Sequence, residues 1–182
     1  MLSILLVLIL VWHFYIGYSR GIILQAYYLV ASIASLVIAS QFYRTLAEKI
    51  TLWVPYSNAS QGATVAFFTD VNIFDLDQVY YAGVAFTAIY IVAYLLFRLI
   101  GVLMHLAPIH HFDNVKMNCI SGVLAILVTL IFFNLALTVL ATVPMTMVQN
   151  ILSGSFLVRV IINYLPPLSS IIKALWVTAI LG

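Results

Sequence analysis

The residues best suited to chemistry in this sequence are four that could hold a metal ion or titrate near neutral pH. They share one polar connection and are His105, His110, His111 and Asp113. Metal sites on helices favour spacings that bring the ligands to one face, as in a pair four residues apart. The adjacent pair His110 and His111 points two ways instead. We therefore predict no metal site and name His110, His111 and Asp113 as the candidates if there is one. The alternatives are a structural or interfacial role and proton sensing.

A second polar pair lies inside a long apolar segment. Asn134 and Thr138 are one helical turn apart there. Polar groups inside a membrane often mark a path for an ion or a solute. They also form hydrogen bonds between neighbouring helices. Both interpretations stay open for this pair.

Enzyme signatures are missing from the sequence. It holds no H-E-x-x-H motif, no phosphate-binding glycine loop and no G-x-S-x-G nucleophile turn. No Asp or Glu falls inside an expected membrane span, so the paired carboxylates of an intramembrane protease are also missing. We expect no enzymatic activity and no cofactor.

Composition indicates where these side chains must lie. Of the 182 residues, 65% are hydrophobic and 7% are charged, against roughly 45–50% and about 25% in an average soluble domain. The chain is therefore expected to be an all-α polytopic membrane protein, with the lipid bilayer around it. The net charge of +2 comes without a dense basic run, which argues against nucleic-acid binding. The single cysteine, Cys119, excludes an internal disulfide.

The apolar segments predict about four transmembrane helices, in two hairpins, within a single membrane domain of residues 1–182. A span needs about 20 apolar residues to cross roughly 30 Å of hydrocarbon. The expected spans cover residues 1–18, 22–43, 79–98 and 119–143. A helix of about 12 residues reaches only about 18 Å and is too short to cross. Short amphipathic or interfacial helices are expected at residues 44–54, 149–165 and 170–181.

The turn of the first hairpin is predicted at "GYSRG", residues 17–21. An arginine at the centre of a bilayer costs about 2.5–3.5 kcal/mol on insertion scales. Arg20 is therefore expected at the reversal, outside the acyl chains. Gly17 and Gly21 permit the backbone angles of a tight turn. Two roles for Arg20 stay open, which are orienting the hairpin by its charge and contacting an anionic lipid or a partner.

Small residues recur at helical spacing in two of the expected spans. They are Ala31, Ser35 and Ala39 in the second span and Ser121, Gly122 and Ala125 in the fourth. Small side chains let two helices approach closely within a membrane. We predict that these residues form helix-packing contacts.

Basic residues near the short connections favour one orientation. Arg20 lies in the first connection, and Arg98 and Lys116 flank the third. We therefore prefer these two connections inside the cell and both termini outside. The outer parts also hold Arg44 and Lys49, among others, so the asymmetry of charge is small.

Four motifs carry a resemblance to a known family. They are "GYSRG" at residues 17–21, "QFYRTLAEKI" at 41–50, "NCISGVLA" at 118–125 and "SGSFLVRVI" at 153–161. In this layout, from Met1 to Pro166, the chain resembles the colicin V production protein family (CvpA) of bacterial inner membranes. Family members usually carry a second glycine where this chain has Ala125. The resemblance implies a multi-pass protein of the bacterial plasma membrane, needed for toxin (bacteriocin) production or export or for envelope maintenance, with no agreed molecular activity.

Three functional hypotheses follow. The first is an accessory membrane protein of the colicin V production type that acts through a membrane-protein partner or as a homo-oligomer. The second is a small oligomeric channel or solute transporter, with Asn134, Thr138 and the basic hairpin lining its path. The third is an intramembrane enzyme that uses the histidine connection, which the missing signatures disfavour.

Overall fold

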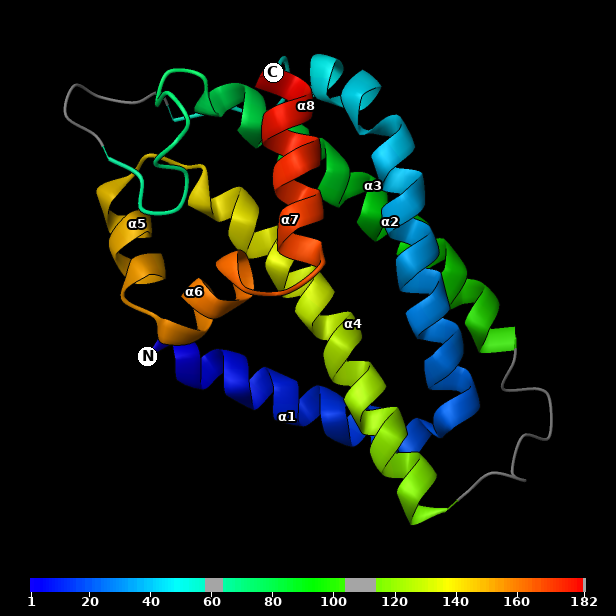
Figure 1. Cartoon of the computed structure of the whole chain (residues 1–182). Coiled ribbons are helices and arrows are strands. Elements are labelled where there is room, and N and C mark those ends of the chain that lie inside the picture. The colour runs from blue at the N-terminus through cyan, green and yellow to red at the C-terminus, as the bar shows by residue number, and fades with distance from the viewer. Residues whose placement is uncertain (58–63, 104–113, 182) are drawn as a thin grey trace.

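The computed structural model describes residues 1–57, 64–103 and 114–181, and within these ranges every regular element is a helix. This confirms the predicted all-α class. Four of the described helices are long and apolar enough to cross a membrane. They are α1 (Leu2–Arg20), α2 (Ile22–Ile50), α3 (Leu76–Leu103) and α4 (Val115–Ala141). Figure 1 shows the four with the C-terminal helices beside them.

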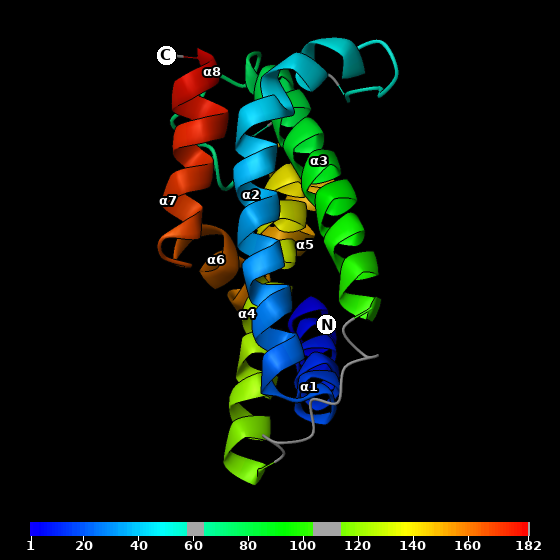
Figure 2. The ribbon, with the colours of Figure 1, turned by 90° about the vertical axis from the view of Figure 1, so that its right-hand side faces the viewer.

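Helices α2 and α3 lie side by side and antiparallel (Figures 1 and 2). Near the end of α3, a Cβ added to Gly101 would come within 2.9 Å of ring atoms of both Tyr27 and Tyr28, near the start of α2. The Tyr27 hydroxyl also donates a hydrogen bond of 2.8 Å to the carbonyl of Phe97. The end of α3 and the start of α2 therefore share one end of the bundle, which is the end where α1 turns into α2.

Helix α4 packs against α1 and α2, and α1 runs crosswise to α2 (Figure 1). Only 11% of the apolar window of α1 is buried, so little of this helix is enclosed by the rest of the protein. The predicted packing residues of α2 are inside the bundle, since Ala31, Ser35 and Ala39 are all buried. The α1–α4 contact is the one that shapes the site described below.

The second helix is longer than predicted. We expected a separate surface helix at residues 44–54, but α2 continues through Arg44 to Ile50 and only residues 51–54 form a turn. The segment Arg44–Ile50 holds strong helix formers and neither glycine nor proline, so nothing in it ends the helix. In Figure 2 this last part of α2 bends away from the rest of the helix.

The C-terminal tail folds back onto the bundle. It contains α5 (Thr146–Ser153), α6 (Phe156–Asn163), α7 (Leu168–Lys173), the π-helix η3 (Ala174–Thr178) and α8 (Ala179–Leu181). Helix α6 and the helical segment 168–181 meet at 68° and together are apolar enough for a bent fifth span. Trp176 is fully buried, and a Cβ on Gly83 of α3 would lie 2.7 Å from its ring. From the length of the tail we expected it either at the membrane interface or packed beside the bundle, and Trp176 shows that it packs against the bundle and contributes to its core.

Candidate functional site

Only one of the two predicted turn glycines forms the turn. Gly21 has φ 83° and ψ 161°, a conformation that essentially only glycine adopts. Gly17 lies inside α1 and is buried against α4. A Cβ on Gly17 would lie 2.5 Å from the Cβ of Ala125 and 2.8 Å from the carbonyl oxygen of Ser121. The predicted turn role of Gly17 was therefore wrong, because this glycine is needed where two helix backbones approach.

The α1–α4 crossing brings Gly17 together with the three predicted packing residues of α4. The single hydroxyl proton of Ser121 is shared between the carbonyls of Gly17 and of Gly21, the second at 3.0 Å. A Cβ on Gly122 would lie 2.5 Å from the ring of Phe14 on α1. These contacts hold the end of α1, and with it Arg20, in a defined place.

Beside this crossing lies a cleft of about 440 Å³ between α1, α3 and α4, with one residue from α2. We call it the two-arginine cleft. Its polar lining residues are His13, Arg20, Gln25, Tyr90, Tyr94, Arg98 and Thr129. The remaining lining residues are apolar and come mainly from the middle of α1, α3 and α4. Its volume lies within the roughly 300–1,000 Å³ typical of small-molecule pockets.

The two arginines of the cleft meet at one aromatic ring. The guanidinium carbon of Arg20 lies 5.1 Å from the centre of the Tyr28 ring, and that of Arg98 lies 6.0 Å from the same centre. Both distances fit cation–π contacts. Arg20 is partly buried and Arg98 is exposed, and their like charges repel each other. Tyr28 therefore contacts the positive charges of both arginines that line the cleft.

No carboxylate in the described ranges pairs with either arginine. Helix α3 begins beside Asp77 and carries Arg98 near its other end, a separation of about 32 Å at 1.5 Å per residue. Glu48 lies in the last turn of α2, at the end of that helix opposite to Arg20. The cleft thus concentrates positive charge at the end of the bundle away from these acids.

Gln25 adds an unsatisfied polar group to the cleft. Its side chain is 2% exposed, and its Oε1 atom is buried without a hydrogen-bond partner in the described part of the chain. A buried acceptor without a donor costs free energy on the order of 1–3 kcal/mol. Gln25 is also one of the residues that line the cleft.

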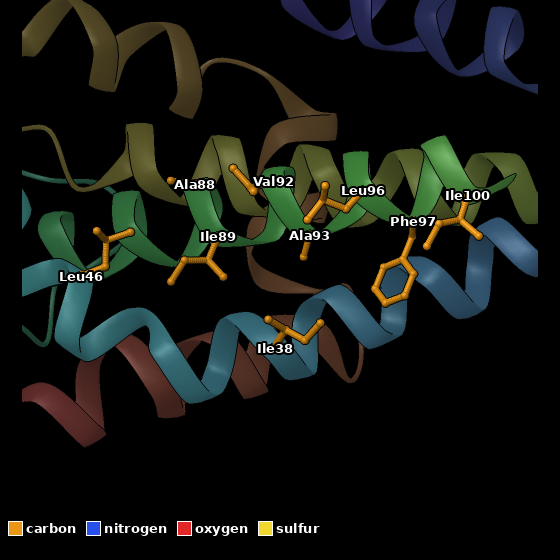
Figure 3. Close-up of a pocket in the computed structure, with 9 residues that line it drawn as sticks. All are labelled: Ile38, Leu46, Ala88, Ile89, Val92, Ala93, Leu96, Phe97 and Ile100. Atoms are coloured by element: carbon orange, nitrogen blue, oxygen red, sulfur yellow. The ribbon is translucent and has the colours of Figure 1, made fainter. Parts of the chain in front are cut away.

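A second hollow, of about 490 Å³, lies between α2 and α3. In Figure 3, Ile38 and Leu46 come from α2, while Ile89, Ala93 and Phe97 of α3 point toward them. All nine lining residues are Ala, Val, Leu, Ile or Phe. Such a wall accepts a hydrocarbon chain but offers no group to select a polar ligand. We therefore take the two-arginine cleft as the candidate functional site.

Asn134 and Thr138 lie in the protein core and are not among the residues that line the cleft. Both are buried. The side-chain amide nitrogen of Asn134 donates to the carbonyl of Ile161 and, at 3.3 Å, to the hydroxyl of Ser169. Asn134 therefore ties α4 to α6 and α7, as expected of a polar residue that bonds a neighbouring helix.

The histidine connection falls outside the described residues, and so do His105, His110, His111 and Asp113. Within the described ranges no group of three His, Cys, Asp or Glu side chains could hold a metal ion. The predictions made for that connection stay predictions.

Sequence reasoning singled out Arg20 but missed Gln25, Tyr94 and Arg98 as parts of the same site. Arg98 ends up beside Arg20 because α3 runs antiparallel to α2 and therefore ends where α1 ends. A signal was present, since both arginines come at the ends of apolar spans. Gln25 gave a weaker one, as an amide one turn into the second span.

Comparison with known proteins agrees with this architecture. The family model of the colicin V production protein matches residues 2–166. The chain is also similar to the uncharacterized transmembrane protein YshB of Bacillus subtilis (strain 168), with 32% identity over 180 residues that cover 97% of each chain. No solved structure matches the chain.

Proposed function

The chain belongs to the colicin V production protein family, and from this premise we propose that it is an accessory protein of the bacterial inner membrane. It supports toxin production or export, or envelope maintenance. It does so by binding a ligand in the two-arginine cleft and by contacting membrane partners or further copies of itself. Catalysis is not part of the proposal.

The observation that carries this proposal is the pairing of Arg20 and Arg98 over Tyr28 at the mouth of a cleft. Two guanidinium groups without a neighbouring carboxylate in the described ranges are suited to an anion, because each offers several N–H donors in a fixed plane. A site of this kind recognises an anion and holds it. The helices around it place the ligand at one face of the membrane.

The orientation follows from the same charges. Arg20, Arg98 and Lys116 lie at the end of the bundle where α1 and α3 finish and α4 begins. Basic residues near short connections favour the cytoplasmic side. We therefore place the mouth of the cleft at the cytoplasmic face of the inner membrane.

The burial of Asn134 and Thr138 supports this proposal over the oligomeric channel. Both side chains are occupied by the core of one copy, so assembly of several copies does not turn them toward a shared path. The exposed face of α1 remains open for a partner within the membrane, because little of that helix is buried.

A deletion strain complemented with variants tests the proposal. Secreted toxin activity and uptake of a membrane-impermeant dye are measured in parallel, with protein levels checked by immunoblot. The double variant Arg20→Gln/Arg98→Gln should fail to restore whichever of the two the deletion impairs. Arg44→Gln is the matched control, because Arg44 also lies over a tyrosine ring, 5.9 Å from the centre of Tyr43, but at the opposite end of α2. Full restoration by the double variant would refute a role for the cleft.

A further inference from the structure

We propose that the two-arginine cleft binds the headgroup of an anionic phospholipid that also carries a free hydroxyl group, with phosphatidylglycerol as the simplest example. The inference rests on the proposed function in taking the cleft as a ligand site. It goes beyond it by naming the chemistry of the ligand. Charge, shape and an unpaired acceptor each contribute one part of the argument.

Charge selects the phosphate. Arg20 and Arg98 both line the cleft and lie within 6.0 Å of one ring centre, so an anion in the cleft is attracted by both guanidinium groups. Arginine and phosphate form strong, charge-assisted hydrogen bonds that are often bidentate. A phosphate bound between the two groups would also relieve their mutual repulsion. A headgroup with its own ammonium is less suitable, because two positive charges already stand at the mouth.

Shape selects a lipid over a free phosphate. Both arginines come close to the ends of their helices, where α1 and α3 leave the apolar region. The cleft continues along α1 to Ile9, about 16 Å of helix from Arg20. Along this stretch most of the lining residues are apolar, including Ile91 and Leu95 of α3, and the polar ones are His13, Tyr90, Tyr94 and Thr129. An amphiphile matches this lining, with its phosphate at the arginines and its glycerol and acyl carbons along the apolar residues.

The unpaired Oε1 atom of Gln25 favours a ligand that carries a hydroxyl group. Gln25 is 2% exposed and its Oε1 atom has no donor in the described part of the chain. An ionised phosphodiester has acceptor oxygens only and cannot satisfy it. A hydroxyl group can donate one hydrogen bond and accept others. A headgroup that carries both groups therefore fits the two arginines and Gln25 together.

The binding test uses the full-length protein in a neutral detergent. Native mass spectrometry gives the affinity for phosphatidylglycerol, phosphatidylmethanol and phosphatidylcholine of equal chain length, with soluble glycerophosphate as a competitor. Phosphatidylglycerol should bind about tenfold more tightly than phosphatidylcholine, a ratio that corresponds to one charge-assisted contact. Phosphatidylmethanol carries the same singly charged phosphodiester without a hydroxyl group and should bind less tightly than phosphatidylglycerol.

Variants assign the binding to the cleft. Arg20→Gln/Arg98→Gln should remove the preference for phosphatidylglycerol over phosphatidylcholine, while Arg44→Gln keeps it. Arg20→Lys/Arg98→Lys keeps the charge without the planar fork and should retain part of the preference, which guards against loss of fold in the glutamine variant. Gln25→Leu should abolish the advantage of phosphatidylglycerol over phosphatidylmethanol and leave the preference over phosphatidylcholine.

Three results would overturn the inference. Equal affinity for phosphatidylglycerol and phosphatidylcholine would refute the role of the net negative charge of the headgroup. Competition by glycerophosphate at the same concentration as the lipid would point to a soluble ligand. Equal binding of phosphatidylmethanol and phosphatidylglycerol by the unaltered protein would refute the role of the hydroxyl group.

The complementation assay separates this inference from the proposed function. If the double glutamine variant loses lipid preference but still complements, the lipid site stands and the functional role of the cleft falls. If the unaltered protein shows no lipid preference but the variant fails to complement, the role of the cleft stands and its ligand is not this lipid.

Discussion

Ser121 of α4 donates its hydroxyl proton to the main-chain carbonyl of Gly17 in α1, at the point where the two helices cross. The same hydroxyl also lies 3.0 Å from the carbonyl of Gly21. One side chain thus fixes both the crossing and the turn that follows it. The position of Arg20 between these two carbonyls depends on this contact.

Gly17→Ala should destabilise the protein by about 1–3 kcal/mol, the usual cost of an overpacked contact. The new Cβ would lie 2.5 Å from the Cβ of Ala125. The free energy of unfolding of the purified protein in detergent measures the effect. Adding Ala125→Gly should restore part of the stability, since it removes the nearest atom. If the double variant Gly17→Ala/Ala125→Gly is as unstable as Gly17→Ala alone, the contact between these two residues does not explain the loss of stability.

Gly21→Ala should cost about 1–3 kcal/mol for another reason, namely the strained backbone that any side chain would have there. A Cβ on Gly21 would meet nothing within 4 Å, yet φ is 83°. Unfolding in detergent is again the measurement. Adding Ala125→Gly should not restore stability to Gly21→Ala. The same second substitution therefore distinguishes the close helix contact at Gly17 from the backbone strain at Gly21. Unchanged stability of Gly21→Ala would contradict the turn.

Asn134→Ala should loosen the C-terminal tail. It removes the donor to Ile161 and Ser169, and hydrogen bonds between membrane helices contribute about 0.6 kcal/mol on average and at most about 1.7 kcal/mol. Amide hydrogen exchange should rise in α6 and α7 and stay unchanged in α1. Ser35→Ala is the control, because the buried Ser35 hydroxyl bonds within its own helix, to the carbonyl of Ala31. An equal rise in hydrogen exchange for both variants would refute a specific role of Asn134 in holding α6 and α7 against α4.

Cys119 allows a direct test of orientation. It is exposed near the start of α4, one turn after Lys116. A membrane-impermeant maleimide should label it in inverted inner-membrane vesicles and leave it unlabelled in intact spheroplasts. Thr51→Cys in a Cys119→Ser background places the thiol at the exposed turn after α2 and should show the reverse pattern. Labelling of Cys119 in spheroplasts would reverse the proposed orientation.

The class of fold and the membrane helices could be read from the sequence because both depend on local properties. Apolar length predicts a span wherever it occurs, and α1 to α4 follow the expected segments closely. The predicted helix boundaries were wrong where the amino-acid composition fits two different structures. Arg44–Ile50 is amphipathic enough for a surface helix, but its residues also continue a helix without interruption.

The candidate site could be predicted only in part, because it depends on which helices meet. Arg20 stood out by its charge between two glycines. Its pairing with Arg98 required the antiparallel packing of α2 and α3, and Gly17 was misread because glycine serves both turns and close crossings. Only the position of Ala125 and Ser121 across from Gly17 decides between these uses.

The contact between Gly17 and Ser121 joins residues 104 positions apart. At a synthesis rate of about 5–20 residues per second, roughly 5–20 s pass before the ribosome delivers α4 to the membrane. During that interval α1 lies in the membrane without its contact to α4. The crossing is therefore a late event in biogenesis, and Arg20 reaches its final place only after the fourth helix has been inserted.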